Sequence, residues 1–340
     1  MTAGTLPNLS AQDQQEIRPG PDKERTLHIA ILLATRNGAA YLPEQLASYA
    51  AQSHADWSLR VGDDGSTDAT RDQVAAFGRA HPDHRVALEE GPRAGAAANF
   101  LCLVERAAAE TPGACLAFSD QDDVWLPEKS ARAIDRLGQA GALEPGGPVA
   151  VHVCRTRLTD ARLNPAGLSR LPPRGYDFGN ALVQNVLGGN TIVLSPAAAA
   201  LVARTVPAAR EAGVAHHDWW VYLVVTGAGG LVLSDPEPGV LYRQHGDNLM
   251  GNHGGIRTRL KRLEQVSRGL HARWIDSNLA ALDRVDTLLA PAARHLAARF
   301  RDARRRGPRA LVEVLREGQI RRQTPNGDRL LHWQARTARL

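Results

Sequence analysis

Residues 115–125 read CLAFSDQDDVW, an apolar run that passes directly into an acidic cluster. The run Cys115–Phe118 is short and almost wholly apolar, as expected of a parallel strand covered on both faces. Asp120, Asp122 and Asp123 follow it within four positions. Ligands of open α/β sheets bind beyond the carboxyl ends of the strands, so this stretch predicts a strand that ends at a binding site.

The same pattern occurs twice upstream of this stretch. Leu27–Leu33 predicts a strand that ends in the polar turn Thr35–Gly38, and Trp57–Val61 predicts one that ends in Asp63–Asp68. Arg85–Leu88 predicts another strand. Spacing of apolar residues predicts helices between and after these strands, over residues 42–51, 68–79, 97–110 and 127–139.

This alternation of strands and helices predicts an α/β fold with a mostly parallel central sheet and helices on both faces. Carboxyl ends of parallel strands meet at one edge of a sheet, so we expect the three polar clusters to converge there. The second half is less regular. It predicts strands over 149–154, 191–194, 231–233 and 240–242, helices over 196–204 and 219–225, and a loop over 158–176.

Composition places the chain among ordinary globular proteins. It has 340 residues, of which 43% are hydrophobic and 23% charged, and this excludes disorder of the whole chain. Three cysteines without close spacing argue against a disulfide framework. Residues 1–26 are polar, lack an apolar signal core and predict a disordered lead, and no run approaches the roughly 20 apolar residues of a membrane span. We therefore expect a cytoplasmic protein.

Positive charge is concentrated near the C-terminus. Residues 251–340 carry 20 Lys and Arg against 8 Asp and Glu, although the whole chain has a net charge of only +5. We expect a mainly α-helical extension over 255–340, with breaks at Pro291, Gly307 and Pro325. A basic segment fits nucleic acid or an anionic membrane surface, and it is equally well a solvated, arginine-rich helical face. Nucleic acid is disfavoured because the segment lacks regularly spaced aromatic residues and the remaining chain is acidic.

Each polar cluster has a functional interpretation and a structural one. The carboxylates of 120–123 fit a divalent cation such as Mg²⁺ or Mn²⁺, or cap the next helix. Asp63 and Asp64 could recognise a nucleotide or form an Asx-turn. Asp218 is a general base or a helix cap, and His245 a metal ligand or a surface histidine. Neither a phosphate-binding P-loop nor a G-x-G-x-x-G pattern follows the first strand.

The order of the motifs is more specific than any one of them. TRN (35–37), DDGSTD (63–68), SDQDDVW (119–125), GGNT (188–191), HHDWW (216–220) and YRQHGDN (242–248) follow one another along the chain. This series resembles the inverting glycosyltransferases of family 2, and more narrowly their rhamnosyltransferase-like bacterial members. The resemblance covers about residues 27–250. It implies a GT-A fold over 27–254, with a nucleotide-sugar-binding half (27–140) and an acceptor or catalytic half (141–254).

The resemblance also implies roles for individual residues. Asp218 matches the catalytic base, with His217 in place of the usual acidic neighbour, and Asp122 and His245 match metal contacts. Residues implied to bind the nucleotide-sugar are Thr35, Arg36, Asn37, Asp63, Asp64, Asp120, Gln121 and Arg243. Residues implied to border the acceptor are Gly188, Gly189, Asn190, Trp219 and Trp220, although for the two tryptophans core packing is the alternative.

The function implied is transfer of a sugar to a saccharide or lipid-linked saccharide during synthesis of a bacterial surface polysaccharide. The donor implied is dTDP-rhamnose, with UDP-glucose, UDP-galactose or UDP-N-acetylglucosamine as the alternative, and the cofactor is Mg²⁺ or Mn²⁺. A catalytically silent relative that binds nucleotide-sugars is a further hypothesis. Together with a lipid-borne acceptor, the basic extension leads to the hypothesis of peripheral contact with the inner face of the cell membrane.

Overall fold

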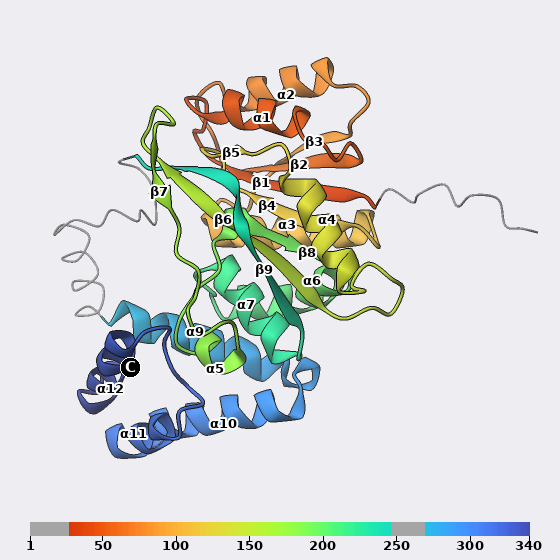
Figure 1. Ribbon diagram of the computed structural model, residues 1–340. Helices are drawn as coiled ribbons and strands as arrows, with labels where there is room; N and C mark the ends of the chain where they lie inside the picture. The colour runs from red at the N-terminus through yellow and green to blue at the C-terminus, as the bar shows by residue number, and fades with distance from the viewer. Residues whose placement is uncertain (1–26, 246–268) are drawn as a thin grey trace, which may run out of the picture.

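The computed structural model describes residues 27–245 and 269–340. The predicted disordered lead (1–26) and the boundary predicted at 254/255 lie outside these residues. One sheet runs through the described part, in the order β3-β2-β1-β4-β8-β6-β9-β5, with β7 paired to β6 (Figure 1). The strands are β1 (Ile29–Thr35), β2 (Trp57–Asp63), β3 (Val86–Glu90), β4 (Cys115–Ser119), β5 (Val124–Trp125), β6 (Ala150–Thr159), β7 (Pro165–Leu168), β8 (Ile192–Leu194) and β9 (Leu231–Arg243).

The first half of the sheet is parallel, as the sequence predicts. Strands β3, β2, β1 and β4 are parallel neighbours, so the carboxyl ends of these four strands lie at one edge. The second half is mixed, because β8 runs antiparallel to both β4 and β6, while β6 and β9 are parallel. The short strand β5 pairs antiparallel with the end of β9. This pairing brings the acidic segment after β4 next to Arg243 and His245.

Helices cover both faces of the sheet, because the strands carry apolar side chains on both faces, as β1 shows. Its alternate residues Ile29, Ile31 and Leu33 join one apolar core, whereas Ala30 and Leu32 join the other. The first core is completed by α1 (Leu42–Ala50), α2 (Thr70–Ala80) and α4 (Lys129–Gln139). The second contains α3 (Ala96–Glu110), α5 (Phe178–Ala181), α6 (Pro196–Glu211) and α7 (His217–Gly227).

Three predictions for the second half were wrong in detail. The predicted loop 158–176 contains the end of β6 and all of β7, whose side chains are exposed and so give no alternating apolar signal. The two predicted strands 231–233 and 240–242 are one strand, β9, with register shifts opposite residues 154–156. Helix α6 continues to Glu211 with Pro207 inside it.

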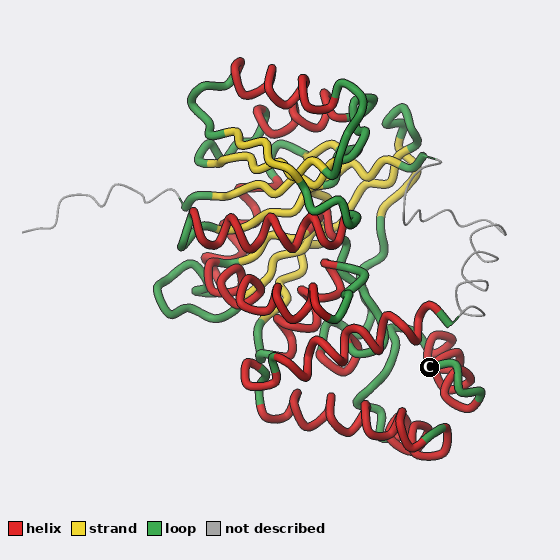
Figure 2. Tube along the Cα trace, turned by 180° about the vertical axis from the view of Figure 1, so that it is seen from behind, coloured by secondary structure: helices red, strands yellow, loops and turns green. Residues whose placement is uncertain are grey.

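The C-terminal extension is helical, and its helices meet at the predicted breaks. It comprises α9 (Leu270–Arg284), α10 (Pro291–Arg306), α11 (Pro308–Arg316) and α12 (Pro325–Arg336). Figures 1 and 2 show these helices as a layer beneath α7, on the side of the sheet away from α1 and α2. Buried residues of the extension, such as Ile275, Phe300 and Leu331, belong to the same apolar core as α7. The extension is therefore built into the core beneath α7. No helix of the described residues is long and apolar enough to span a bilayer.

His271 of α9 lies where the extension meets α7. Its ring stacks on Trp219 at a centroid distance of 5.9 Å, and its Nε2 lies 3.2 Å from the carbonyl oxygen of Val183. Burial lowers the pKa of His271 to about 3, and the positive charge of Arg322 lowers it further in the same direction. His271 is therefore neutral in the folded protein at neutral pH. Protonation would place a charge in this buried contact beside Arg322, so it opposes the packing of α9 on α7.

We therefore expect His271 to make stability fall on acidification. Above pH 6.5 the residue is neutral in both states, whereas between about pH 6.5 and 3 the unfolded chain binds a proton that the folded protein does not. This linkage lowers the free energy of unfolding by at most about 1.4 kcal/mol per pH unit in that window. Urea unfolding of His271→Gln between pH 7.5 and 5 should show a shallower pH slope than wild type.

The exposed His295 of α10 provides the control, because His295→Gln should keep the wild-type slope. Equal slopes in wild type and His271→Gln would show that His271 does not couple the extension to pH.

Candidate functional site

Gln121 joins the loops that follow β1 and β4. Thr35 donates its hydroxyl to Gln121 Oε1 at 2.6 Å, and the backbone N–H of Arg36 donates to the same oxygen at 2.9 Å. Gln121 Nε2 donates in return to the carbonyl oxygen of Arg36. A Cβ on Gly38 would lie 2.5 Å from Gln121 Oε1, so a side chain there would displace Gln121 from these hydrogen bonds. Thr35, Arg36 and Gln121, all predicted to contact the donor, thus lie together.

Asn37 connects the loop after β1 to the loop after β2. It adopts a positive φ of 49°, which asparagine tolerates better than most residues. Its backbone N–H donates to Ser66 Oγ at 2.9 Å, and its Oδ1 accepts from the Thr67 N–H at 2.8 Å. Asn37 therefore fixes the position of the DDGSTD loop relative to the TRN turn.

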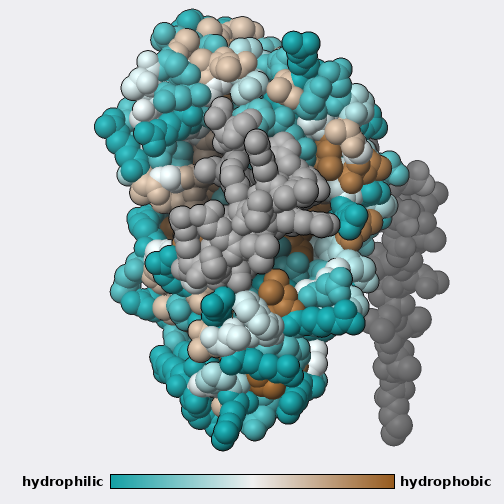
Figure 3. Space-filling view, turned by 90° about the vertical axis from the view of Figure 1, so that its left-hand side faces the viewer, coloured by the Kyte–Doolittle hydropathy of each residue, from teal (hydrophilic) through white to brown (hydrophobic). Residues whose placement is uncertain are grey.

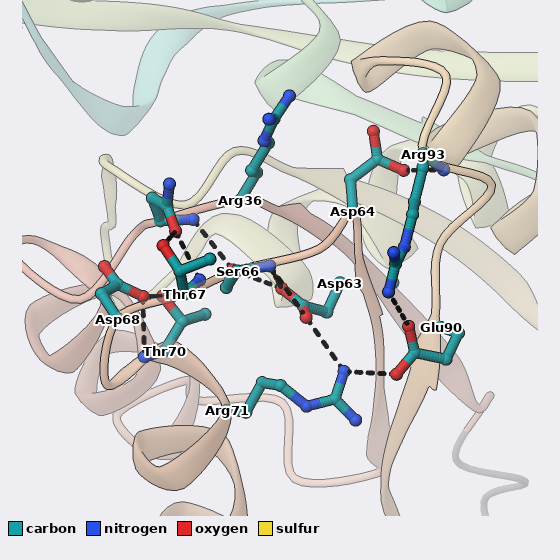
Figure 4. A network of polar contacts seen from close by, with 12 residues as sticks. Arg36, Asp63, Asp64, Ser66, Thr67, Asp68, Thr70, Arg71, Glu90 and Arg93 are labelled. Carbon is teal, nitrogen blue, oxygen red and sulfur yellow. Dashed lines mark hydrogen bonds and ion pairs between the residues drawn. The ribbon is translucent and has the colours of Figure 1, made fainter.

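Asp63 and Asp64 are buried, and their carboxylates organise the loop after β2 (Figure 4). Asp63 accepts hydrogen bonds from Ser66 and from Arg71 at 2.9 Å. Asp64 accepts from the backbone N–H groups of Arg93 and Gly95. The guanidinium of the exposed Arg36 points away from Asp63. Both carboxylates thus use part of their hydrogen-bonding capacity to hold the loop.

Asp122 and His245 are hydrogen-bonded to each other at the carboxyl edge of β4. His245 Nε2 lies 2.8 Å from Asp122 Oδ2, and neither side chain is fully buried. Tyr41 stacks on the His245 ring at a centroid distance of 4.6 Å. Among the described residues, no group of three or more His, Cys, Asp or Glu is arranged around a metal position. The pair fits a cation that takes a carboxylate from the protein and further oxygens from substrate phosphates and water.

Asp123 has a different role from its neighbour. It is completely buried, and its two oxygens accept from the Asn190 side chain and from the backbone N–H of Arg243. Arg243 is also buried, and it donates to the carbonyl oxygens of Asp122 and Ala161 and to Glu44. Asn190 was predicted to contact the acceptor and Arg243 the donor. In the structure the polar groups of both side chains form hydrogen bonds within the protein itself.

Negative charge accumulates at this edge. Burial raises the pKa of Asp120 to about 7, and the nearby charges of Asp122 and Asp218 act in the same direction. Burial likewise raises the pKa of Asp123, as do the charges of Asp120 and Asp122. Carboxylates crowded in this way repel each other until a proton or a cation neutralises part of the charge. A divalent cation fits this environment.

Asp218 lies in the first turn of α7, where the sequence predicts the base. Its Oδ1 accepts from the N–H of Trp219 at 2.8 Å. The ring of His217 stacks on Phe100 at 4.0 Å, and burial lowers the pKa of His217 to about 4. His217 is therefore neutral at neutral pH, and it places no positive charge beside Asp218.

Gly189 packs directly against the start of α7. It belongs to the 3-10 helix η1 (Gly189–Thr191), and a Cβ on it would lie 2.8 Å from His217 Nε2 and 3.7 Å from Asp218 Cβ. Gly188, beside it, is exposed. The GGNT segment thus borders the predicted base, and Gly189 allows the close approach.

The prediction that Trp219 and Trp220 bind the acceptor was wrong. Both side chains are buried, Trp220 completely. Trp219 Nε1 donates to the Ala181 carbonyl oxygen at 2.6 Å, and Trp220 Nε1 donates to Thr205 Oγ1 at 2.9 Å. Both indoles therefore belong to the core, which was the alternative interpretation.

Sequence analysis missed Tyr41 and Glu44. Tyr41 stacks on His245 and lies beneath the Arg243 guanidinium at 4.9 Å, and Glu44 pairs with Arg243. Both belong to the start of α1, which has only an ordinary helix-start signal with Pro43. The pairing of β5 with β9 brings Arg243 and His245 to α1, and no local pattern predicts that contact.

Most of the chain is similar to one glycosyltransferase, and about a third of it is similar to another. It is 27% identical over 244 residues to the dTDP-rhamnosyl transferase RfbG of Shigella flexneri, covering 69% of this chain and 78% of that protein. Over 109 residues it is 31% identical to the UDP-Glc:alpha-D-GlcNAc-diphosphoundecaprenol beta-1,3-glucosyltransferase WfgD of Escherichia coli, covering 32% of this chain and 40% of that protein.

The fold also resembles that of a solved glycosyltransferase. Residues 1–349 of S. aureus TarS, crystallised with UDP, superimpose with a TM-score of 0.51 at 15% identity, covering 92% of this chain and 88% of that one. This likeness concerns the fold, and it confirms the predicted GT-A architecture. The sequence model of the family described as Glycosyl transferase family 2 matches residues 30–201, just over half of the chain. The protein is therefore a glycosyltransferase that belongs to glycosyl transferase family 2.

Proposed function

We propose that the protein transfers L-rhamnose from dTDP-rhamnose to a saccharide or lipid-linked saccharide, with inversion, in the synthesis of a bacterial surface polysaccharide. The observation that carries the proposal is the meeting of Asp120, Asp122 and His245 at one sheet edge, within electrostatic reach of Asp218. The residues proposed to bind the donor and the residue proposed as the general base thus lie at one site. Similarity to RfbG over most of the chain supports rhamnose as the sugar.

Inversion requires one displacement, in which the acceptor hydroxyl attacks the sugar from the side opposite the departing nucleoside diphosphate. Asp218 takes the hydroxyl proton as the new bond forms. The N-terminal end of α7 directs the positive end of its dipole toward this carboxylate. The GGNT segment borders the base, because Gly189 packs against His217 and Asp218 and the exposed Gly188 lies beside it.

Asp122 and His245 would hold Mg²⁺ or Mn²⁺, which, when bound, stabilises negative charge on the departing diphosphate. Asp120 adds negative charge to the same edge. Thr35, Arg36 and Asn37 form the turn that faces the nucleotide; Gln121 bonds to this turn from the loop after β4, and Asp63 and Asp64 lie in the adjoining loop. Asn190 and Arg243 act indirectly in this account, by holding Asp123 and the end of β9 in place.

A UDP-sugar is the second candidate donor, supported by the similarity to WfgD over about a third of the chain. The name of that protein describes an acceptor carried on a lipid diphosphate. A lipid-linked acceptor places the enzyme at the inner face of the cell membrane, as a cytoplasmic protein in peripheral contact. A silent relative would bind a donor without transferring its sugar.

Thermal-shift titration with Mn²⁺ distinguishes the donors. We expect dTDP-rhamnose to raise the melting temperature more than dTDP, UDP-glucose, UDP-galactose or UDP-N-acetylglucosamine at equal concentration, because ligands that bind only the folded state stabilise it by mass action. A larger shift with one UDP-sugar would replace rhamnose with that sugar.

Asp218→Asn tests the base. The amide keeps the shape of the side chain and cannot accept the proton, so we expect transfer to fall by about 10²–10⁴-fold while donor binding stays unchanged. Release of nucleoside diphosphate in the presence of acceptor measures transfer, and the thermal shift measures binding.

Asp72→Asn is the matched control, because Asp72 is exposed and also lies in the first turn of a helix, α2. It should transfer at the wild-type rate. Normal turnover by Asp218→Asn would remove Asp218 from the mechanism, and donor binding without transfer by wild type on a wide acceptor panel would favour the silent relative.

A further inference from the structure

The extension leaves a group of arginines without carboxylate partners. Residues 269–340 carry 15 Arg and 7 Asp or Glu. Most of these acids already form ion pairs, namely Asp276 with Arg304, Asp283 with Arg301, Glu317 with Arg299 and Asp328 with Arg174. Among the described residues, neither Arg305 nor Arg306 has a carboxylate within ion-pair distance. The positive charge of these two exposed side chains is therefore available to a ligand.

These arginines line a cavity between α10 and α11. It has a volume of about 540 Å³ and is lined by Arg299, Asp302, Arg305, Arg306 and Val314. Three guanidinium groups and one carboxylate thus line the cavity; Arg299 pairs with Glu317, and Asp302 lies 3.5 Å from Arg301 Nε, which leaves Arg305 and Arg306, within the described part of the chain, as the unpaired cations of the lining. Guanidinium groups bind phosphate oxygens through paired N–H donors, which a single carboxylate in the lining does not offset.

We propose that this cavity binds the phosphate headgroup of an anionic membrane lipid and so docks the enzyme on the bilayer. The proposal rests on the lipid-linked acceptor of the proposed function, and it names the partner and the binding face. Arg305 and Arg306 would attract the phosphate. Arg299 adds a third basic side chain to the lining of the cavity, and Val314 adds an apolar one. Each basic residue near an anionic bilayer contributes about 1 kcal/mol, so the pair is sufficient to affect binding.

The neighbouring helix favours a lipid surface over a soluble anion. Trp333 of α12 is 43% exposed, and the Arg339 guanidinium lies 5.2 Å from its ring centroid. Arg329 and Arg336 are exposed four residues before and three after Trp333, which places all three on one face of the helix. An indole flanked by basic residues is typical of the membrane–water interface. Helix α12 packs on α11, the helix that contributes Val314 to the cavity.

The visible surface agrees with electrostatic docking at the headgroups. Figure 3 shows the lower part of the molecule, which the extension occupies, as mostly hydrophilic, with small separate apolar areas. Such a surface lies on a bilayer and does not insert deeply. Since the extension shares its core with α7, its removal would disturb the catalytic helix, and point variants are the appropriate test.

The experiment is co-sedimentation of the full-length protein with vesicles of phosphatidylcholine, with and without phosphatidylglycerol. We expect binding only to vesicles that contain phosphatidylglycerol, and about 30-fold weaker partitioning for the double variant Arg305→Gln/Arg306→Gln, from about 1 kcal/mol per arginine. The matched control, Arg79→Gln/Arg204→Gln, removes the same charge from exposed positions on α2 and α6 and should bind like wild type.

Equal losses in the two double variants would show that net charge alone drives binding and would overturn the site. So would release from the vesicles by inorganic phosphate or by transfer RNA at the same ionic strength, which would identify a soluble anion or a nucleic acid as the ligand. Unchanged vesicle binding in Arg305→Gln/Arg306→Gln would assign these arginines to stabilising the C-terminal end of α10.

The result is separable from the proposed function, because vesicle binding needs no catalysis. Transfer to a water-soluble saccharide acceptor should be equal in wild type and Arg305→Gln/Arg306→Gln. Failure of transfer in wild type with intact vesicle binding would count against the proposed reaction and leave the lipid site standing.

Discussion

The buried carboxylate of Asp123 is the contact on which the site depends. One oxygen accepts from Asn190, in the GGNT segment that packs against the start of α7, and the other accepts from the backbone of Arg243 at the end of β9. These two hydrogen bonds join three segments that lie far apart in the sequence. They place Asp122 beside His245 and bring the GGNT segment close to the acidic edge. A buried carboxyl group that lost either partner would be costly, so this junction is strongly constrained.

The sequence predicted the parts of the fold that depend on local pattern. Apolar runs followed by polar clusters located β1, β2 and β4 and the edge at which they meet. This was possible because the spacing of apolar residues, and the end of each run at which the polar residues stand, can be read from the local sequence. The role of Asp123 could not be predicted, since DQDD offers four adjacent residues and only tertiary contacts determine which carboxylate faces inward. The same holds for Asn190 and Arg243, whose polar side chains gave no sign that they would be buried.

Errors in the second half have a related cause. Strand β7 is exposed along its whole length, so it lacks the alternation that predicts a strand. The HHDWW motif located Asp218 at the start of α7, but the motif could not show that its two indoles turn into the core. Aromatic residues near a predicted base are as compatible with packing as with sugar binding, and burial decides between them.

The extension and α7 pack together as one structural unit. His271 and Trp274 of α9 contact Trp219 and His216 beside the base, and the segment before α12 bonds to residues that lead toward the GGNT segment. The extension therefore supports α7 and, in our proposal, is also the face toward the membrane. This combination would hold the base at a fixed orientation to a lipid-borne acceptor.

The central claim is that Asp122 binds the metal that couples the protein to its donor. Isothermal titration of the preferred nucleotide-sugar with and without Mn²⁺ tests it in wild type, in Asp122→Asn and in Asp83→Asn, which alters an exposed loop residue. We predict that Mn²⁺ strengthens donor binding in wild type and Asp83→Asn, and that Asp122→Asn loses this gain while remaining folded. An equal gain from Mn²⁺ in all three proteins would contradict the account.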